Sequence, residues 1–160
     1  MKATDEAKQP DNAGVAFRPP LLLLAVLGVG FFLRWLAPLS VSTSTAPART
    51  GPAIVALAFA IFFWAVITML RGHTSIPTNK PTKAIVAGGP FRFSRNPIYV
   101  SMILLQIGVG AWTNSLWFFL LAAIFVALLR WGVISREERY LERKFGDRYL
   151  SYKSRVRRWI

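Results

Sequence analysis

The sequence predicts an all-α integral membrane protein with about four transmembrane helices, the last two forming a helical hairpin, and a C-terminal amphipathic helix on the cytoplasmic side. Two observations lead to this fold class. The chain of 160 residues is 54% hydrophobic, yet it carries a formal charge of +13 from 20 Lys and Arg against 7 Asp and Glu. Its apolar and basic residues are separated along the chain, as they are in proteins that cross a lipid bilayer.

Two apolar runs are long enough to cross a bilayer. Residues 21–39 include one charged residue, Arg34, and residues 52–70 include none. A helix of that length, rising about 1.5 Å per residue, matches a hydrocarbon core of roughly 30 Å. Because the first run is longer than the apolar region of a signal peptide, about 7–15 residues, we interpret it as a membrane anchor.

A third uncharged stretch covers residues 97–129. It is too long for one span of about 20 residues, and it has a polar break at Thr113, Asn114 and Ser115. We therefore expect a helical hairpin, with one arm at residues 97–112 and the other from residue 116 to about residue 134. Asn96 is a good N-cap and Pro97 suits a first helical turn, so the first arm is expected to begin there.

Basic residues mark the predicted cytoplasmic side. The loop after the first run carries only Arg49, whereas residues 71–95 carry five Lys and Arg and the tail from Arg130 carries ten. The positive-inside rule then places both termini in the cytoplasm of a multi-pass protein of the inner membrane. Residues 1–20 lack an apolar period and are expected to be disordered, which leaves residues 21–160 as a single domain.

Beyond residue 134 the pattern becomes amphipathic. Aromatic residues recur at helical spacing among basic ones, at Tyr140, Phe145, Tyr149 and Tyr152. We expect a helix that continues from the last span along the membrane surface, with a bend at Gly146.

The composition excludes several classes of protein. The chain has no Cys and one His, so disulfide scaffolds, cysteine nucleophiles and metal sites built from thiolates or several histidines are not expected. We predict no metal site and no nucleic-acid partner. Every strongly basic segment flanks a membrane span, where the same residues set topology and attract anionic lipid at about 1 kcal/mol each.

The start of the third stretch is a candidate anion site. A helix N-terminus carries a partial positive charge and free N–H groups, and the forked guanidinium of Arg95 beside it suits a carboxylate or phosphate. A second interpretation is equally open at this point. In it, Arg92 and Arg95 contact lipid phosphates, and Asn96 with Pro97 only caps the helix.

Glu137 and Glu138 form the second candidate cluster. Adjacent carboxylates on a basic helix commonly serve only in i,i+4 ion pairs, worth a few tenths of a kcal/mol. A hairpin, however, returns the last span to the membrane face that holds Arg95. An arginine for a carboxylate and an acid for hydroxyls or a cation together suit a zwitterionic nucleotide.

At these two places the sequence resembles the isoprenylcysteine carboxyl methyltransferase and phospholipid N-methyltransferase superfamily of integral-membrane enzymes. The resemblance covers roughly residue 52 to the C-terminus. The matching residues are Gly89, Pro90, Phe91 and Arg92, then Arg95, Asn96, Pro97, Ile98 and Tyr99, then Glu137, Glu138, Arg139, Tyr140 and Leu141, and then Phe145, Gly146, Tyr149 and Tyr152.

The resemblance implies a methyltransferase that binds S-adenosylmethionine at the cytoplasmic ends of the last two spans. It implies catalytic roles for Arg95, Tyr99 and Glu138. The cofactor-binding residues implied are Gly88, Gly89, Pro90, Phe91, Arg95, Asn96, Pro97, Tyr99, Glu137 and Glu138.

The expected acceptor is lipid-like, either an isoprenoid carboxylate or a phospholipid amine. Asn96 stands where carboxyl-methylating members commonly have histidine, which leaves the choice of acceptor open. His73 and Gln106 are candidate substrate-binding residues. Methyl transfer from a sulfonium depends mostly on positioning and needs no covalent enzyme intermediate, which suits this composition.

A second function of a different class is a small membrane scaffold or transporter subunit, whose basic face would bind anionic lipid or a partner protein. No Asp or Glu lies within a predicted span, although transporters usually need such a residue near mid-membrane. A third alternative, a relative of membrane sterol reductases, is disfavoured by the short chain. The sequence therefore favours the enzyme.

Overall fold

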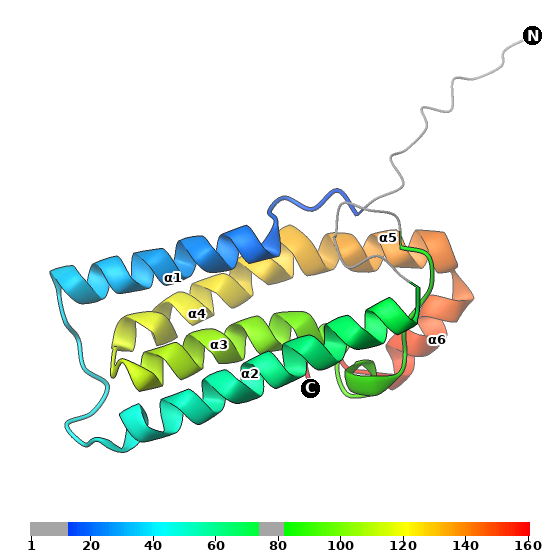
Figure 1. The fold of residues 1–160 in the computed structure, drawn as a ribbon. Helices are drawn as coiled ribbons and strands as arrows, with labels where there is room; N and C mark the ends of the chain where they lie inside the picture. The colour runs from blue at the N-terminus through cyan, green and yellow to red at the C-terminus, as the bar shows by residue number, and fades with distance from the viewer. Residues whose placement is uncertain (1–12, 74–81) are drawn as a thin grey trace, which may run out of the picture.

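The computed structural model describes residues 13–73 and 82–160, and every regular element in these ranges is helical. Figure 1 shows the helices side by side, alternating in direction along the bundle. In chain order the elements are α1 (Pro19–Leu36), α2 (Ala46–Arg71), the 3-10 turn η1 (Gly89–Arg92), α3 (Pro97–Trp112), α4 (Leu116–Leu129), the π-helical turn η2 (Arg130–Ile134), α5 (Ser135–Phe145) and α6 (Asp147–Arg155).

The predicted multi-pass membrane fold is confirmed. Three apolar helical stretches of the described chain are long enough to cross a membrane, namely α1, α2 and the continuous helix Leu116–Phe145. The arms of the predicted hairpin are α3 and α4. Because α3 is apolar but only 16 residues long, its role as a fourth span stays a prediction.

The first two helices differ from their predicted bounds. Helix α1 covers Pro19–Leu36 instead of residues 21–39, and α2 begins at Ala46 instead of residue 52. Hydropathy alone placed the second start too late, because α2 takes in a polar first turn with Pro47 near its N-terminus and keeps Pro52 inside the helix. Proline is favourable in a first turn, where its missing N–H has no helical partner to lose.

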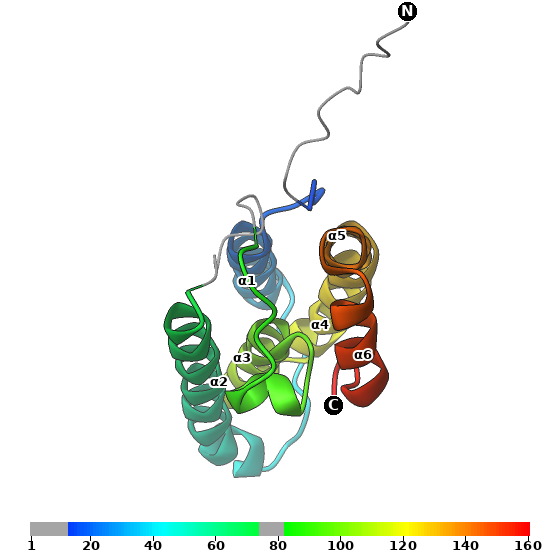
Figure 2. The same ribbon diagram turned by 90° about the vertical axis from the view of Figure 1, so that its right-hand side faces the viewer.

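Helix α3 occupies the middle of the bundle and packs against α1, α2 and α4 (Figure 2). Its closest approach is to α2. A Cβ atom added to Gly51 would lie 2.3 Å from the backbone nitrogen of Trp112, and one added to Gly108 would lie 2.9 Å from the backbone nitrogen of Val55. Glycines on both helices thus bring the two backbones together, as is usual between helices in membranes.

The outside of the bundle is apolar. Large side chains such as Phe32, Trp35 and Phe63 are about half exposed or more, which is the arrangement expected of helices that face lipid. The buried core on the other side includes Val26, Phe125 and further apolar residues of α1, α3 and α4.

The π-helical turn η2 joins α4 to α5. The segment that precedes α1, residues 13–18, packs against this turn and the start of α5. The backbone N–H of Ala16 donates to the carbonyl of Gly132 over 3.0 Å, and Arg136 donates to the carbonyl of Gly14. A Cβ on Gly132 would lie 2.8 Å from the ring of Phe17. Residues 13–18 are thus attached to the bundle, which differs from the disordered segment predicted for residues 1–20; residues 1–12 lie outside the described ranges.

The C-terminal part consists of two helices, α5 and α6, that meet at an angle (Figure 1). Gly146 between them has φ +52°, a left-handed conformation that favours glycine. The bend expected at Gly146 is therefore a complete break. An amphipathic cytoplasmic helix along the membrane stays a prediction.

Candidate functional site

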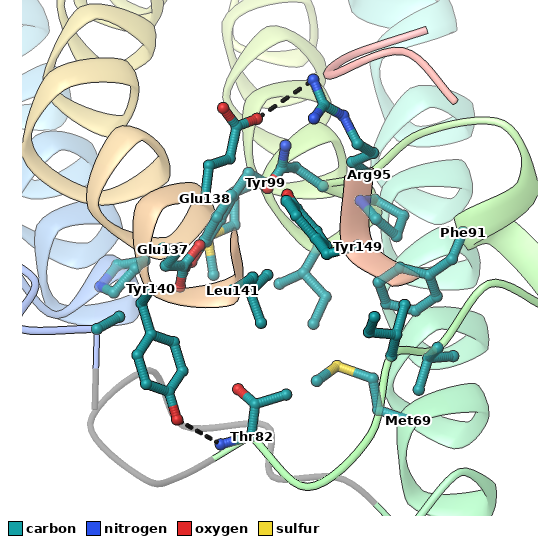
Figure 3. Close-up of a pocket in the computed structure, with 18 of the residues that line it drawn as sticks. Met69, Thr82, Phe91, Arg95, Tyr99, Glu137, Glu138, Tyr140, Leu141 and Tyr149 are labelled. Carbon is teal, nitrogen blue, oxygen red and sulfur yellow. Dashed lines mark hydrogen bonds and ion pairs between the residues drawn. The ribbon is translucent and has the colours of Figure 1, made fainter. Parts of the chain in front are cut away.

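One cavity of about 530 Å³ lies at the end of the bundle where α5 and α6 meet the loop before α3. Figure 3 shows side chains from these elements and from α2 around it. Its polar lining comprises Arg18, Thr82, Arg95, Asn96, Tyr99, Glu137, Glu138, Tyr140, Tyr149 and Tyr152. All four tyrosines of the chain are in this set.

The loop before α3 positions Arg95. Gly89 has φ +56°, and its backbone lies so close to α2 that a Cβ there would be 2.7 Å from Thr68 Oγ1. The 3-10 turn η1 follows, with Phe93 N–H donating to the carbonyl of Pro90 over 3.1 Å. This tight path against α2 brings Arg95 to the cavity just before α3 begins.

Arg95 and Glu138 form the ion pair drawn at the top of Figure 3. Arg95 Nη2 lies 3.3 Å from Glu138 Oε1, and the two side chains are only 9% and 8% exposed. A second arginine, Arg158, contacts Glu138 through two hydrogen bonds of 3.0 and 2.7 Å. Two guanidinium groups thus surround one carboxylate, which leaves this cluster with a positive charge.

The guanidinium of Arg95 is incompletely paired. Its Nε and Nη1 atoms are buried and have no hydrogen-bond partner among the residues that the structure describes. A buried cation that lacks partners loses hydration without compensation, which costs more than for a neutral group. An unpaired guanidinium donor next to a cavity suits a ligand carboxylate.

Glu137 is held differently from its neighbour. Tyr99 donates its hydroxyl proton to Glu137 Oε1 over 2.8 Å, and both residues line the cavity. No cation in the described ranges forms an ion pair with Glu137. The cavity therefore has one neutralised carboxylate, at Glu138, and one without a cationic partner, at Glu137.

Two tyrosines of α6 close the polar end of the cavity. Burial raises the pKa of Tyr149 to about 12, with the Glu138 carboxylate as a further cause and the Arg95 guanidinium acting in the opposite direction. Burial likewise raises the pKa of Tyr152, whose hydroxyl donates to the carbonyl of Phe91 over 2.8 Å. Both hydroxyls are therefore neutral hydrogen-bond donors near neutral pH.

The chain beyond α6 is attached to the same loop. The N–H of Arg95 donates to the carbonyl of Arg157 over 2.9 Å, and the Asn96 amide donates to the carbonyl of Arg158 over 3.0 Å. Asn96 was expected to bind a cofactor, but its amide nitrogen is used by the C-terminal backbone. The side chain of Asn96 thus serves to join two parts of the site.

Much of the remaining lining is apolar. Leu21 of α1, Phe62 and Met69 of α2, and Ile98 and Met102 of α3 contribute to it. A cavity lined by both charged and apolar side chains fits a ligand, or a pair of ligands, of mixed polarity.

The structure brings most of the sequence-predicted site residues together. The cavity lining includes seven of them, namely Phe91, Arg95, Asn96, Pro97, Tyr99, Glu137 and Glu138. Five others lie outside the lining, namely His73, Gly88, Gly89, Pro90 and Gln106.

The five residues outside the lining have other surroundings. His73 is exposed at the end of α2, and Gly89 backs onto Thr68. Gln106 is fully buried within the bundle, and neither its Oε1 nor its Nε2 has a partner in the described chain. Substrate roles for His73 and Gln106 stay predictions without a cavity contact.

Sequence reasoning missed several lining residues. Tyr140 and Tyr149 were assigned to an amphipathic helix and to the resemblance but not to the site, although the confinement of tyrosine to positions from 99 onward was a usable signal. Phe62 and Met69 gave no signal, because apolar residues in a span can face lipid, protein or ligand equally. Arg158 is one of ten basic residues in the tail, and nothing in the pattern separates it from the others.

The sequence pattern of the phospholipid methyltransferase family matches residues 47–148 of this chain. An uncharacterised protein of Haemophilus influenzae is 40% identical over 63 residues, which are 39% of this chain and all of that protein. The cobalt-zinc-cadmium resistance protein CzcN of Cupriavidus metallidurans is 33% identical over 70 residues, which are 44% of this chain and 32% of CzcN. No solved structure matches.

Proposed function

Since this chain belongs to the phospholipid methyltransferase family, we propose that it transfers a methyl group from S-adenosylmethionine to a lipid-like acceptor. The membrane methyltransferase activity follows from the family, and the multi-pass fold agrees with it. The identity of the methyl donor and the class of acceptor are the new parts of the proposal.

The observation that carries the proposal is the incomplete pairing of Arg95. S-adenosylmethionine has a carboxylate that could accept from one of the unpaired buried nitrogens, Nε or Nη1. The cavity volume of about 530 Å³ lies within the usual range for small-ligand sites, roughly 300–1,000 Å³. The donors and the space therefore fit the nucleotide.

When bound, S-adenosylmethionine supplies an electrophilic methyl group on its sulfonium. The residues of this chain act by position. Arg95 holds the carboxylate, and Glu138, paired with Arg95 and Arg158, orients that arginine. The remaining catalytic effect comes from alignment of donor and acceptor, which can lower a barrier by several kcal/mol, up to roughly 7–11.

The apolar part of the cavity lining supports a lipid-like acceptor. It includes Leu21, Phe62 and Met102 from α1, α2 and α3, which suit contact with an acyl or isoprenoid chain. Glu137 favours an amine acceptor over a carboxylate, because its carboxyl group has no cationic partner in the described chain and can accept a hydrogen bond from an amine. Glu137 can also receive the proton that an ammonium must lose before it is methylated.

We assign the cavity end of the bundle to the cytoplasmic side of the inner membrane. The support is the concentration of Lys and Arg in residues 71–95 and from Arg130 onward, combined with the positive-inside rule. This orientation gives the site access to cytoplasmic nucleotide.

Calorimetric titration of the detergent-purified protein tests the donor. The wild type is expected to bind S-adenosylhomocysteine at least about tenfold more tightly than the analogue that lacks only the carboxylate, since a charge-assisted pair is worth about 1.5–3 kcal/mol. Equal affinity for the two ligands, or no binding of either, contradicts the proposal and leaves the scaffold function ahead.

Transfer of a radiolabelled methyl group tests the acceptor. Vesicles that contain phosphatidylethanolamine and, separately, a prenylcysteine are each incubated with labelled donor, and the label in apolar extracts is counted. Glu137→Gln is expected to reduce labelling of the amine lipid, whereas Glu142→Gln, a control that breaks the ion pair with Lys153 outside the cavity, is not. Label that reaches only the prenylcysteine, or neither compound, contradicts the amine assignment.

A further inference from the structure

Arg158 holds Glu138 by both carboxylate oxygens. Its Nε donates to Oε1 over 3.0 Å and its Nη2 donates to Oε2 over 2.7 Å, and the Glu138 side chain is 8% exposed. This is the two-point pairing that makes arginine–carboxylate contacts directional. The orientation of the Glu138 carboxylate is therefore determined mainly by Arg158.

Hydrogen bonds to the backbone of Arg158 fix the position from which its side chain extends. Its carbonyl accepts from Asn96 Nδ2 over 3.0 Å and from Ser94 Oγ over 3.3 Å. The next residue, Trp159, packs against the buried core of the bundle. The side chain of Arg158 thus extends from a backbone anchored on both sides.

The pairing with Arg158 limits what Arg95 can do with Glu138. Arg95 reaches Oε1 through Nη2 alone, at 3.3 Å, and its Nε and Nη1 keep no partner in the described chain. If Arg158 were absent, the freed carboxylate could turn and pair with Nη2 and one neighbouring nitrogen of Arg95. That nitrogen would then no longer be free for a ligand carboxylate.

We propose that Arg158 is a positioning residue, which occupies Glu138 and so keeps the guanidinium of Arg95 free for the carboxylate of the bound nucleotide. This inference rests on the proposed function, because it assigns a nucleotide ligand to Arg95. The C-terminal segment is thereby part of the site, although Arg158 itself is not required to touch the ligand.

The experiment measures the preference for a carboxylate in four proteins, namely wild type, Arg158→Ala, Arg158→Lys and the control Arg155→Ala. Within the described ranges, the side chain of Arg155 bonds only the nearby carbonyl of Ser151 on the exposed side of α6, so its removal takes the same charge from the same tail. Each protein is titrated with S-adenosylhomocysteine and with the analogue that lacks only the carboxylate.

Arg158→Ala is expected to bind S-adenosylhomocysteine about tenfold more weakly, the scale of one charge-assisted contact, while affinity for the analogue changes by less than about twofold. Arg158→Lys should recover part of the loss, since it retains the charge but not the fork. Arg155→Ala should match the wild type.

The double variant Glu138→Gln/Arg158→Ala separates positioning from a general structural role. A neutral amide pairs only weakly with Arg95, so the carboxylate preference should return towards that of the wild type. A structural role predicts no such recovery. The same variant serves if Arg158→Ala alone does not fold.

The possible failures are distinguishable. If the wild type shows no preference for the carboxylate, the proposed function itself is wrong. If the wild type shows the preference and Arg158→Ala keeps it, or loses affinity for both ligands equally, or is not rescued by the second substitution, only the role of Arg158 is overturned.

Discussion

The two ends of the bundle use similar polar residues in opposite ways. At the end away from the cavity, Arg34 donates to the carbonyl of Thr113, and Asn114 exchanges two hydrogen bonds with the backbone of Ser42. At the cavity end, Arg95 keeps two buried nitrogens without a partner in the described chain. Both ends have an arginine beside a cavity, of about 260 Å³ at Arg34 and about 530 Å³ at Arg95, but of these two arginines only Arg95 has buried nitrogens without a partner in the described ranges.

This difference shows what separates a joint from a site. Arg34 and Asn114 at the far end bond backbone groups there, so their effect is to hold the loop before α2 against the tip of the α3–α4 hairpin. The groups at the cavity end hold each other in place and leave capacity for a ligand. The following predictions test whether stability and binding divide between the two ends in this way.

The largest effect is expected at the far-end joint, from Gly51→Ala. A Cβ there would lie 2.3 Å from the backbone nitrogen of Trp112, and backbone atoms cannot rotate away, so we expect about 3 kcal/mol of destabilisation. Thermal unfolding in detergent measures it. Gly28→Ala is the control, since nothing lies within 4 Å of its added Cβ, and a stability loss of similar size there would contradict the assignment.

The next effect is on binding, from Arg95→Ala. We expect affinity for S-adenosylhomocysteine to fall by about 30-fold, within the range for a charge-assisted contact. Arg34→Ala at the far end should leave affinity within about twofold, because distant sites act independently. Calorimetry measures the affinity of both variants for S-adenosylhomocysteine. Comparable losses of affinity would mean that the two ends are not functionally distinct.

A smaller change in stability is expected from Asn114→Ala. Asn114 has φ +48° and makes the two hydrogen bonds to Ser42, of 3.2 and 2.7 Å. Losing them should lower the free energy of unfolding by about 1–2 kcal/mol, with ligand affinity unchanged. Asn114→Gly removes the same bonds without backbone strain, so it should be less destabilising; the opposite order would show that strain at this left-handed position does not contribute to the loss in Asn114→Ala.

The smallest effect is a pH dependence confined to the cavity end. The pKa of Tyr149 is about 12 in the folded protein against 10 for an ordinary tyrosine. From pH 10 to pH 12 the unfolded chain therefore loses this proton while the folded chain keeps it, and the free energy of unfolding falls as the pH rises. Tyr149→Phe should flatten that decline in the unfolding midpoint, and an unchanged slope would remove Tyr149 as its source.

Much of the fold could be predicted from the sequence because a bilayer imposes long uncharged runs. The hairpin arms follow from the polar break at Thr113 to Ser115 and from the start signal at Asn96 and Pro97, and α3 has the predicted bounds of 97 and 112. The start of α2 was missed because composition shows where an uncharged run begins, at residue 52. It does not show that the helix extends further, through the residues before that run, to Ala46.

The candidate site could be predicted only in part. The predicted hairpin topology placed Arg95 and Glu138 at the same end of the bundle, and in the structure their side chains are in contact at 3.3 Å. The partner Arg158 could not be foreseen, because it reaches Glu138 through an extended segment after α6, where no periodic pattern specifies position. Gln106 was equally ambiguous, since a polar residue in a span can face a ligand or the bundle, and it faces the bundle.

The π-helical turn Arg130–Ile134 takes up one extra residue between α4 and α5. The N–H of Ser135 donates to the carbonyl of Arg130, five residues earlier, where a regular α-helix bonds residues four apart. Removing Gly132 would therefore let the chain continue as a regular helix with Glu137 and Glu138 in nearly their present directions. A deletion at Arg136, within α5, would instead rotate both carboxylates by about 100° around the helix axis.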